Sequence, residues 1–158
     1  MRGLLLFVSL VAVLAVQAFA HPHVFFVFLV KVLYDATGFV GVENRWSYDE
    51  IYSAAMLSSV DNNGDGKISA DEQPPLQTAI LDPIEKNNYY NYVQAGSDFL
   101  KARKIRNFKA SMVKGKLVLD FVVDFSMPAT ADWTMLVVVV ADPTNYIQMT
   151  SDMENADV

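Results

Sequence analysis

Alternating apolar and polar positions run through most of this chain and predict strands. Residues 23–34 are dense in β-branched and aromatic side chains, a turn follows at Asp35-Ala36-Thr37-Gly38, and residues 39–48 return as a second strand. This pattern predicts a β-hairpin. Further short strands are expected at residues 89–94, 99–103, 105–113, 117–125, 133–141 and 146–150.

Two of these later strands indicate how the sheet is solvated. In residues 117–125 every second side chain is apolar, while Asp120 and Asp124 share the opposite face. This alternation favours an antiparallel sheet or sandwich with one solvated face. The uninterrupted apolar run Val137–Val140 predicts a central strand buried on both faces.

A helical pattern interrupts the strands between residues 49 and 88. Ser47 and Glu50 have the spacing of a capping box, and apolar residues recur with helical periodicity as far as Val60. A second helix is expected after residue 70, where Ser69 and Glu72 again have the spacing of a capping box. Pro74-Pro75 predicts that this helix is kinked or restarts, and Pro83 interrupts it again.

The loop between these helices has the ligand spacing of an EF-hand. Calcium takes oxygens from positions 1, 3, 5, 7, 9 and 12 of such a loop, and glycine turns the chain at position 6. Here the six positions are Asp61, Asn63, Asp65, Lys67 through its carbonyl, Ser69 and Glu72, with Gly66 at the turn. The sequence therefore predicts an α+β fold, an antiparallel sheet or sandwich with an EF-hand-like helical insertion at about residues 49–88.

An ordinary polar turn is the alternative for this loop, since Asp, Asn and Gly are common turn residues. The match at all six ligand positions favours calcium. Calcium sensors open two helices to expose a groove. The proline-broken exit and the lack of a second loop in the sequence favour a structural calcium ion instead.

The N-terminal segment is typical of export. Arg2 precedes the apolar run Leu4–Val16, and Ala18 and Ala20 form a small-residue cleavage signal. We expect residues 1–20 to be a signal peptide and residues 21–158 to be a single exported domain in the periplasm, without a further membrane span. The chain has no cysteine, so no disulfide supports this domain.

Cleavage after Ala20 would place the chain's two histidines, His21 and His23, at a new N-terminus. Side chains two residues apart on an extended segment lie on the same side, so both imidazoles could meet one ion. Imidazole suits zinc, copper, nickel or cobalt. Two polar residues on an exposed terminus are the alternative, and a zinc site would need further Asp or Glu ligands.

Charge and composition limit the remaining function classes. The chain carries 12 Lys and Arg against 18 Asp and Glu, and loses Arg2 with the leader, which disfavours nucleic acid or an anionic membrane surface and favours cations as partners. The sequence contains no nucleophile paired with a base and no phosphate-binding loop, so it gives no indication of an enzyme. Trp46 and Trp133 are expected in the core, and the Asp120–Asp124 pair on a solvated face.

Four segments, taken in order, resemble a bacterial exported family, domain of unknown function 1007. They are His21-Pro22-His23-Val24-Phe25, Arg45-Trp46-Ser47-Tyr48-Asp49-Glu50, the loop Asp61–Glu72, and Asp142-Pro143-Thr144-Asn145-Tyr146. The resemblance implies the periplasmic component of an ABC-type transport system, with members associated with zinc, nickel or cobalt. Family members usually continue past the last segment into another strand, so we expect this chain to be truncated or divergent there.

The leading hypothesis is a non-enzymatic periplasmic metal-binding accessory of an inner-membrane transporter, with calcium in the loop and a transition metal at His21 and His23. A copper-dependent oxidase or monooxygenase with a histidine brace at His21 is one alternative. A calcium-stabilised interaction domain without a transition metal is the other.

Overall fold

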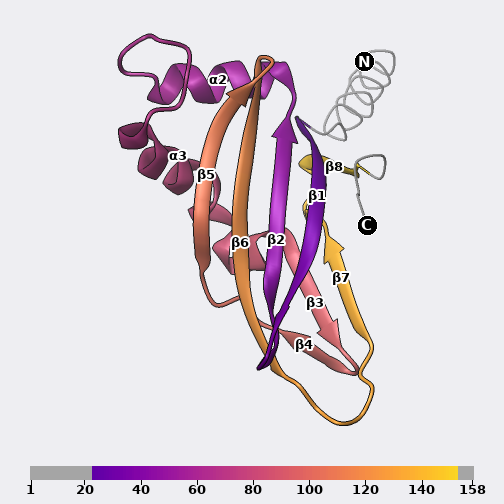
Figure 1. The fold of residues 1–158 in the computed structure, drawn as a ribbon. Helices are drawn as coiled ribbons and strands as arrows, with labels where there is room; N and C mark the ends of the chain where they lie inside the picture. Colours follow the sequence, from indigo (N-terminus) through magenta and orange to yellow (C-terminus); the bar gives the residue numbers. More distant parts are fainter. Residues whose placement is uncertain (1–22, 153–158) are drawn as a thin grey trace, which may run out of the picture.

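The computed structural model describes residues 23–152, which form two packed sheets and a helical segment (Figure 1). The elements in chain order are β1 (Val24–Asp35), β2 (Gly38–Tyr48), α2 (Glu50–Val60), the 3-10 helix η2 (Ala70–Glu72), α3 (Gln73–Ile80), the 3-10 segment η3 (Asp82–Tyr90), β3 (Asn91–Ala95), β4 (Asp98–Leu100), β5 (Ile105–Val113), β6 (Lys116–Pro128), β7 (Leu136–Val140) and β8 (Ile147–Ser151). The predicted α+β class is confirmed.

The larger sheet contains five strands in the order β5-β6-β2-β1-β8. The β1–β2 hairpin predicted from the sequence is present, and β2 and β5 both pair antiparallel with β6. Only β8 departs from this pattern, since it runs parallel to β1. Apolar positions of β6 face inward as predicted, while Asp120 and Asp124 on its other face pair with Arg45 and Arg106.

The smaller sheet contains three strands in the order β4-β3-β7. The prediction of a central strand at Val137–Val140 is wrong, because β7 is an edge strand and Val137 and Val139 are 38% and 48% exposed. A run of valines suits a strand of either kind, and only the pairing decides how many faces are covered.

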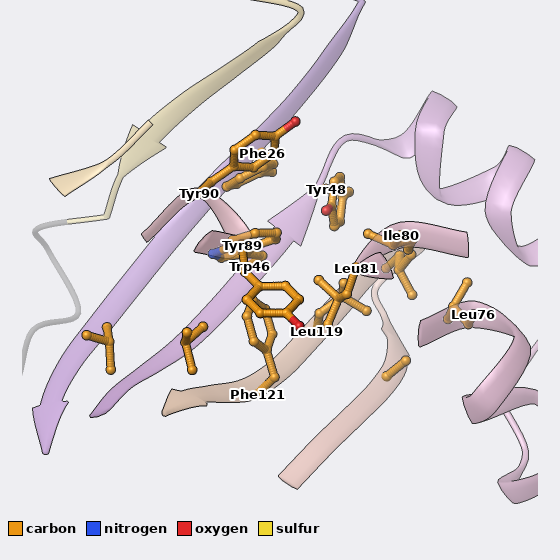
Figure 2. Packing of buried hydrophobic residues seen from close by; sticks show 14 of the residues in the cluster. Phe26, Trp46, Tyr48, Leu76, Ile80, Leu81, Tyr89, Tyr90, Leu119 and Phe121 are labelled. Carbon is orange, nitrogen blue, oxygen red and sulfur yellow. The ribbon is translucent and has the colours of Figure 1, made fainter. Parts of the chain in front are cut away.

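Trp46 lies at the centre of the core between the sheets (Figure 2). Its ring is fully buried, stacks on Phe26 at a centroid distance of 4.6 Å and meets Phe121 edge-on at 4.8 Å. Tyr90 stacks on Trp46 from the chain just before β3, at 6.5 Å, so the aromatic cluster joins the two sheets. Trp133 was also expected in the core, but this is wrong, because it lies fully exposed in the β6–β7 connection.

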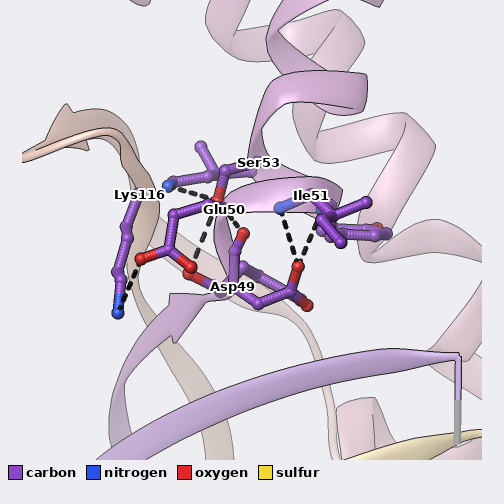
Figure 3. A network of polar contacts seen from close by, with 8 residues as sticks. Asp49, Glu50, Ile51, Ser53 and Lys116 are labelled. Atoms are coloured by element: carbon purple, nitrogen blue, oxygen red, sulfur yellow. Dashed lines mark hydrogen bonds and ion pairs between the residues drawn. The ribbon is translucent and has the colours of Figure 1, made fainter.

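Asp49 begins the helical segment, and not Ser47 as the capping-box spacing predicted. Ser47 still belongs to β2, and the Asp49 carboxylate accepts the N–H groups of Ile51 and Tyr52 at 2.9 Å each (Figure 3). The predicted restart of the second helix is confirmed, since α3 carries its two prolines in the first turn, where a missing N–H costs nothing. Within residues 23–152, no helix combines the length and apolar character needed to span a bilayer.

Candidate functional site

The loop Asp61–Glu72 connects α2 to α3 and contains η2, and its own side chains accept hydrogen bonds from its backbone. Asp61 is its centre: one carboxylate oxygen accepts the N–H of Gly64 at 2.7 Å, and the other accepts the N–H of Gly66 at 3.0 Å. Asn63 and Asp65 each accept an N–H two residues on, from Asp65 and Lys67, at 2.9 Å. These bonds turn the side-chain oxygens at positions 1, 3 and 5 back over the loop.

Glu72, the twelfth residue, closes the loop. It is only 2% exposed, and its two carboxylate oxygens accept the N–H groups of Asn62 at 3.0 Å and Ser69 at 2.8 Å. Ser69 and Glu72 form the capping box that their spacing predicted. The N–H and hydroxyl of Ser69, and then the N–H of Asn62, hold the pKa of Glu72 below its usual value despite its burial.

The donor chemistry of the loop fits calcium. Asp61, Asn63, Asp65, Ser69 and Glu72 offer only oxygen, and Lys67 adds a backbone carbonyl, which is the hard ligand set that calcium prefers. Within residues 23–152 no three His, Cys, Asp or Glu side chains converge as a metal cluster. Both carboxylate oxygens of Glu72 accept backbone N–H groups, so a bidentate contact with an ion would require this side chain to rotate.

Four hydrogen bonds that the sequence did not indicate, two from Ser53 and two from Gln73, hold the helices on either side of the loop. Ser53, fully buried on α2, accepts the N–H of Leu117 at 2.7 Å and donates to the Asp49 carbonyl at 2.6 Å. Beyond the loop, the Gln73 side chain exchanges two hydrogen bonds with the backbone of Ala110, at 2.7 and 2.9 Å. Both helices flanking the loop are therefore bonded to the β5–β6 hairpin. The sequence did not indicate that Ser53 and Gln73 bond to the β5–β6 hairpin, because nothing in the local pattern of polar residues identifies partners so distant in the chain.

Asp49 ties the start of α2 to β1 as well as capping the helix. Its carboxylate accepts the N–H of Phe25 at 3.1 Å, and its own N–H donates to the Phe25 carbonyl at 2.9 Å. Burial raises the pKa of Asp49, but the N–H groups of Tyr52, Phe25 and Ile51 outweigh this effect and leave it below the usual value. Beside it, Glu50 pairs with Lys116 at 3.3 Å (Figure 3).

Of the two predicted histidine ligands, His21 lies outside the described residues and His23 is exposed at the start of β1. The His23 ring packs against Tyr146 at a centroid distance of 5.2 Å, and its backbone N–H donates to the Tyr146 carbonyl at 2.9 Å. The parallel pairing of β8 with β1 brings these residues together. The position of His23 is thus set by the Asp142–Tyr146 segment, 120 residues away in the sequence.

An apolar hollow of about 370 Å³ lies beside His23, between β1, the helices and β8. Tyr52, Tyr90 and Tyr146 contribute to its lining. Burial, with the charge of Asp142 adding to it, raises the pKa of Tyr90 to about 12, so this phenol is protonated at neutral pH. The hollow therefore offers His23 apolar surface and the phenol of Tyr90.

Comparisons with known proteins place the chain among relatives without an assigned activity. An uncharacterised 15.5 kDa protein from the trpE 3′ region of Spirochaeta aurantia is 28% identical over 94 residues, which are 60% of this chain and 66% of that protein. The match thus spans slightly less than two thirds of the relative's length. No solved structure matches the chain. The family described as protein of unknown function (DUF1007) matches residues 6–158, and the chain belongs to that family.

Proposed function

We propose that this protein is a non-enzymatic, exported metal-binding accessory of a transport system, with a structural calcium ion in the loop Asp61–Glu72. The observation that carries the calcium assignment is the way Asp61 gathers the amides of Gly64, Asp65 and Gly66, at 2.7 to 3.2 Å, so that the loop is already curled around its first ligand. This curl reduces the backbone conformational entropy that is lost when an ion is bound, although Glu72 still has to rotate.

Calcium acts on the fold through the two helices that the loop joins. When bound, the ion supplies positive charge between Asp61, Asp65 and Glu72, which otherwise repel one another. Bonds from Ser53 to β6 and from Gln73 to β5 hold α2 and α3 against the sheet. These bonds support a structural calcium ion that leaves the packing of the helices unchanged, in preference to a calcium sensor, in which the two helices separate.

Titration calorimetry with calcium tests the assignment. We expect a dissociation constant of roughly 10⁻⁴ to 10⁻³ M for the native loop, the range of extracellular modules. The double variant Asp61→Ala with Glu72→Ala should give no heat of binding. Lys67→Ala is the matched control, because position 7 coordinates through its backbone carbonyl, and it should bind calcium normally. Equal heats for the native protein and the double variant would remove the loop from the proposal.

The transition-metal part of the proposal rests on His21 and His23 and on the family resemblance. His23 is exposed, and the Tyr146 contact fixes its ring beside the hollow. Elemental analysis and intact mass of the exported protein, compared with His23→Ala, test this part. Zinc, nickel, cobalt or copper bound by the native protein and lost from His23→Ala is expected. Metal content that is equal in both proteins contradicts it.

A further inference from the structure

The β1–β2 turn lies at the end of the molecule opposite the calcium-type loop (Figure 1). Two hollows adjoin this turn. The first, of about 800 Å³, is lined by the turn residues Asp35 and Thr37 and by the segment Arg103–Arg106. The second, of about 400 Å³, is lined by Tyr34 and by the β6–β7 connection with Trp133. We call the surface formed by residues 34–38, 101–106 and 129–135 the docking end.

Cations gather on one side of the docking end. Residues 101–109 contain five of the 12 Lys and Arg of the chain and no acidic residue, although the chain as a whole is acidic. Arg106 is paired with Asp124, but Arg103 and Lys104 are exposed, and neither forms an ion pair with any residue between 23 and 152. The side chains of these two residues are available to an anionic partner.

Edge-strand protection is the alternative explanation for these charges, because lysines often prevent edge strands from pairing with other chains. It applies to Lys109, which lies on the edge strand β5. It does not apply to Lys101, Arg103 and Lys104, which precede β5 in the connection from β4. The adjoining aromatic surface also remains unexplained by edge protection.

Large apolar side chains gather on the other side of the turn. Trp133 is fully exposed and Tyr34 is 61% exposed, and both line the second hollow. Met135, 72% exposed, follows in the same connection, and its carbonyl accepts the N–H of Gly96 in the β3–β4 turn. Phe99, 75% exposed, lies just beyond that turn on β4. Tyr34 and Trp133 share one hollow, and neighbouring exposed apolar side chains of this kind are a feature of interaction sites.

We propose that the docking end binds the surface of an anionic bilayer. Tryptophan and tyrosine favour the interfacial region of membranes, where the ring is in an apolar layer and the polar group stays in water. Lys and Arg next to such rings are attracted to anionic headgroups. This end combines Arg103 and Lys104, which form no ion pair among residues 23–152, with the exposed rings of Tyr34 and Trp133.

The net negative charge of the chain disfavours an anionic surface, but the local contact depends on which charged side chains face that surface. The strand β6 runs from Lys116, beside α2, to Pro128, beside the β1–β2 turn. Its 13 residues span roughly 40 Å. Because the Debye length is about 8 to 10 Å at physiological salt, the carboxylates of the loop Asp61–Glu72 are screened from a surface at the docking end. Binding would point that loop away from the bilayer.

The backbone of the β1–β2 turn packs against the end of β6 and the start of the β6–β7 connection. Gly38 has a φ of 128° and packs so closely on β6 that a Cβ there would collide with the backbone of Met127 and Ala129. The Ala129 N–H also donates to the Thr37 carbonyl at 2.9 Å. The turn and the start of the β6–β7 connection therefore form one rigid unit, which reduces the entropy lost on docking.

Co-sedimentation with vesicles tests the proposal. The exported protein should sediment with vesicles of phosphatidylcholine and phosphatidylglycerol in equal parts, and much less with phosphatidylcholine alone. Arg103→Gln with Lys104→Gln should weaken binding roughly 25-fold, since each cation near the surface accounts for about fivefold. The matched control, Lys86→Gln with Lys114→Gln, removes the same charge elsewhere on the surface and should bind within about twofold of the native protein.

Every variant carries the same N-terminal segment, so binding through that segment would be unaffected by the substitutions. Equal binding of the native protein and the Arg103 and Lys104 variant, or equal losses in both double variants, overturns the proposal. Absence of vesicle binding by the native protein also overturns it, and would leave a protein partner to explain the exposed surface.

Fluorescence locates the contact independently. Trp46 is fully buried and Trp133 fully exposed, so a change of solvent around the docking end appears in the emission of Trp133 alone. We expect a blue shift with anionic vesicles that is absent in Trp133→Phe. Sedimentation without this shift would place the contact elsewhere and overturn the proposal.

Discussion

The loop Asp61–Glu72 and the docking end differ in how they are assembled. All the hydrogen bonds that curl the loop join residues inside its own 12 positions. The docking end combines three segments, at residues 34–38, 101–106 and 129–135, which are separated by up to 100 residues in the sequence. A local site can be recognised from spacing alone, whereas a composite surface requires the sheet that assembles it.

Truncating Leu76 should have the largest effect and would show how far the loop depends on the core. Leu76 is fully buried on α3, directly after the loop (Figure 2). We expect Leu76→Ala to lower the free energy of unfolding by about 2 to 5 kcal/mol, since it removes a packed side chain and leaves a cavity. Urea denaturation measures this loss. A loss below about 1 kcal/mol would mean that α3 is not packed as described.

Calcium should stabilise the loop end without changing the docking end. With a dissociation constant of roughly 10⁻⁴ to 10⁻³ M, about 10 mM calcium should add about 1.4 to 2.7 kcal/mol to the free energy of unfolding. The double variant Asp61→Ala with Glu72→Ala should show no gain. When a chelator is replaced by calcium, the native protein should regain this stability and the double variant should not. An equal gain in Trp133→Ala is the control for the far end.

Removing the cap at Asp49 tests the attachment of the loop to β1. We expect Asp49→Ala to cost about 1 kcal/mol, because α2 loses its N-cap. The Phe25 N–H loses an acceptor in the same variant. Asp49→Asn retains an acceptor oxygen and should lose less. Denaturant unfolding of both variants measures the difference. Equal losses would mean that the charge, and not the hydrogen bonds, is responsible.

Acid should weaken the loop end through Glu72. The pKa of Glu72 is lowered in the folded protein from its usual value of 4.5, so its ionised form stabilises the fold fully above that value. This contribution is lost as the pH falls through the lowered folded pKa. From about pH 5 to about pH 3, the native protein should therefore lose more stability than Glu72→Gln. Parallel pH curves for the two proteins would contradict this role of Glu72.

Changing Trp133 should have the smallest effect on stability. Its side chain is fully exposed, so Trp133→Ala should change the free energy of unfolding by less than about 0.5 kcal/mol. Thermal or urea unfolding measures this. A loss comparable to that of Leu76→Ala would show that the ring is packed in the folded protein and would remove it from the docking end.

Several strands and the loop were predictable because their signals are local. The hairpin at residues 23–48 and the strand at residues 105–113 were predicted within one or two residues at each end, since alternation and turn residues specify them. The capping box of Ser69 and Glu72 was also predicted from its spacing. The role of the loop as a calcium site stays a prediction.

The wrong predictions have one common physical cause. Val137–Val140 and Trp133 were expected to be buried because they are apolar. Whether an apolar segment is covered depends on which strands pair with it, and β7 received only one neighbour. The Ser47 cap failed for a similar reason, since pairing with β1 extends β2 to Tyr48 and moves the start of the helix to Asp49.

The sequence by itself determined the strand-rich pattern, the capping box and the oxygen-donor spacing of the loop, because these depend on contacts within a few residues. Tertiary structure decided which side chains remain exposed and which charges lie together. The cluster of cations at residues 101–109 is visible in the sequence, but only the fold places Arg103 and Lys104 beside the β1–β2 turn, whose neighbouring residues also line a hollow with Trp133. Long-range strand pairing is set by the burial of the whole core, and no single segment encodes it.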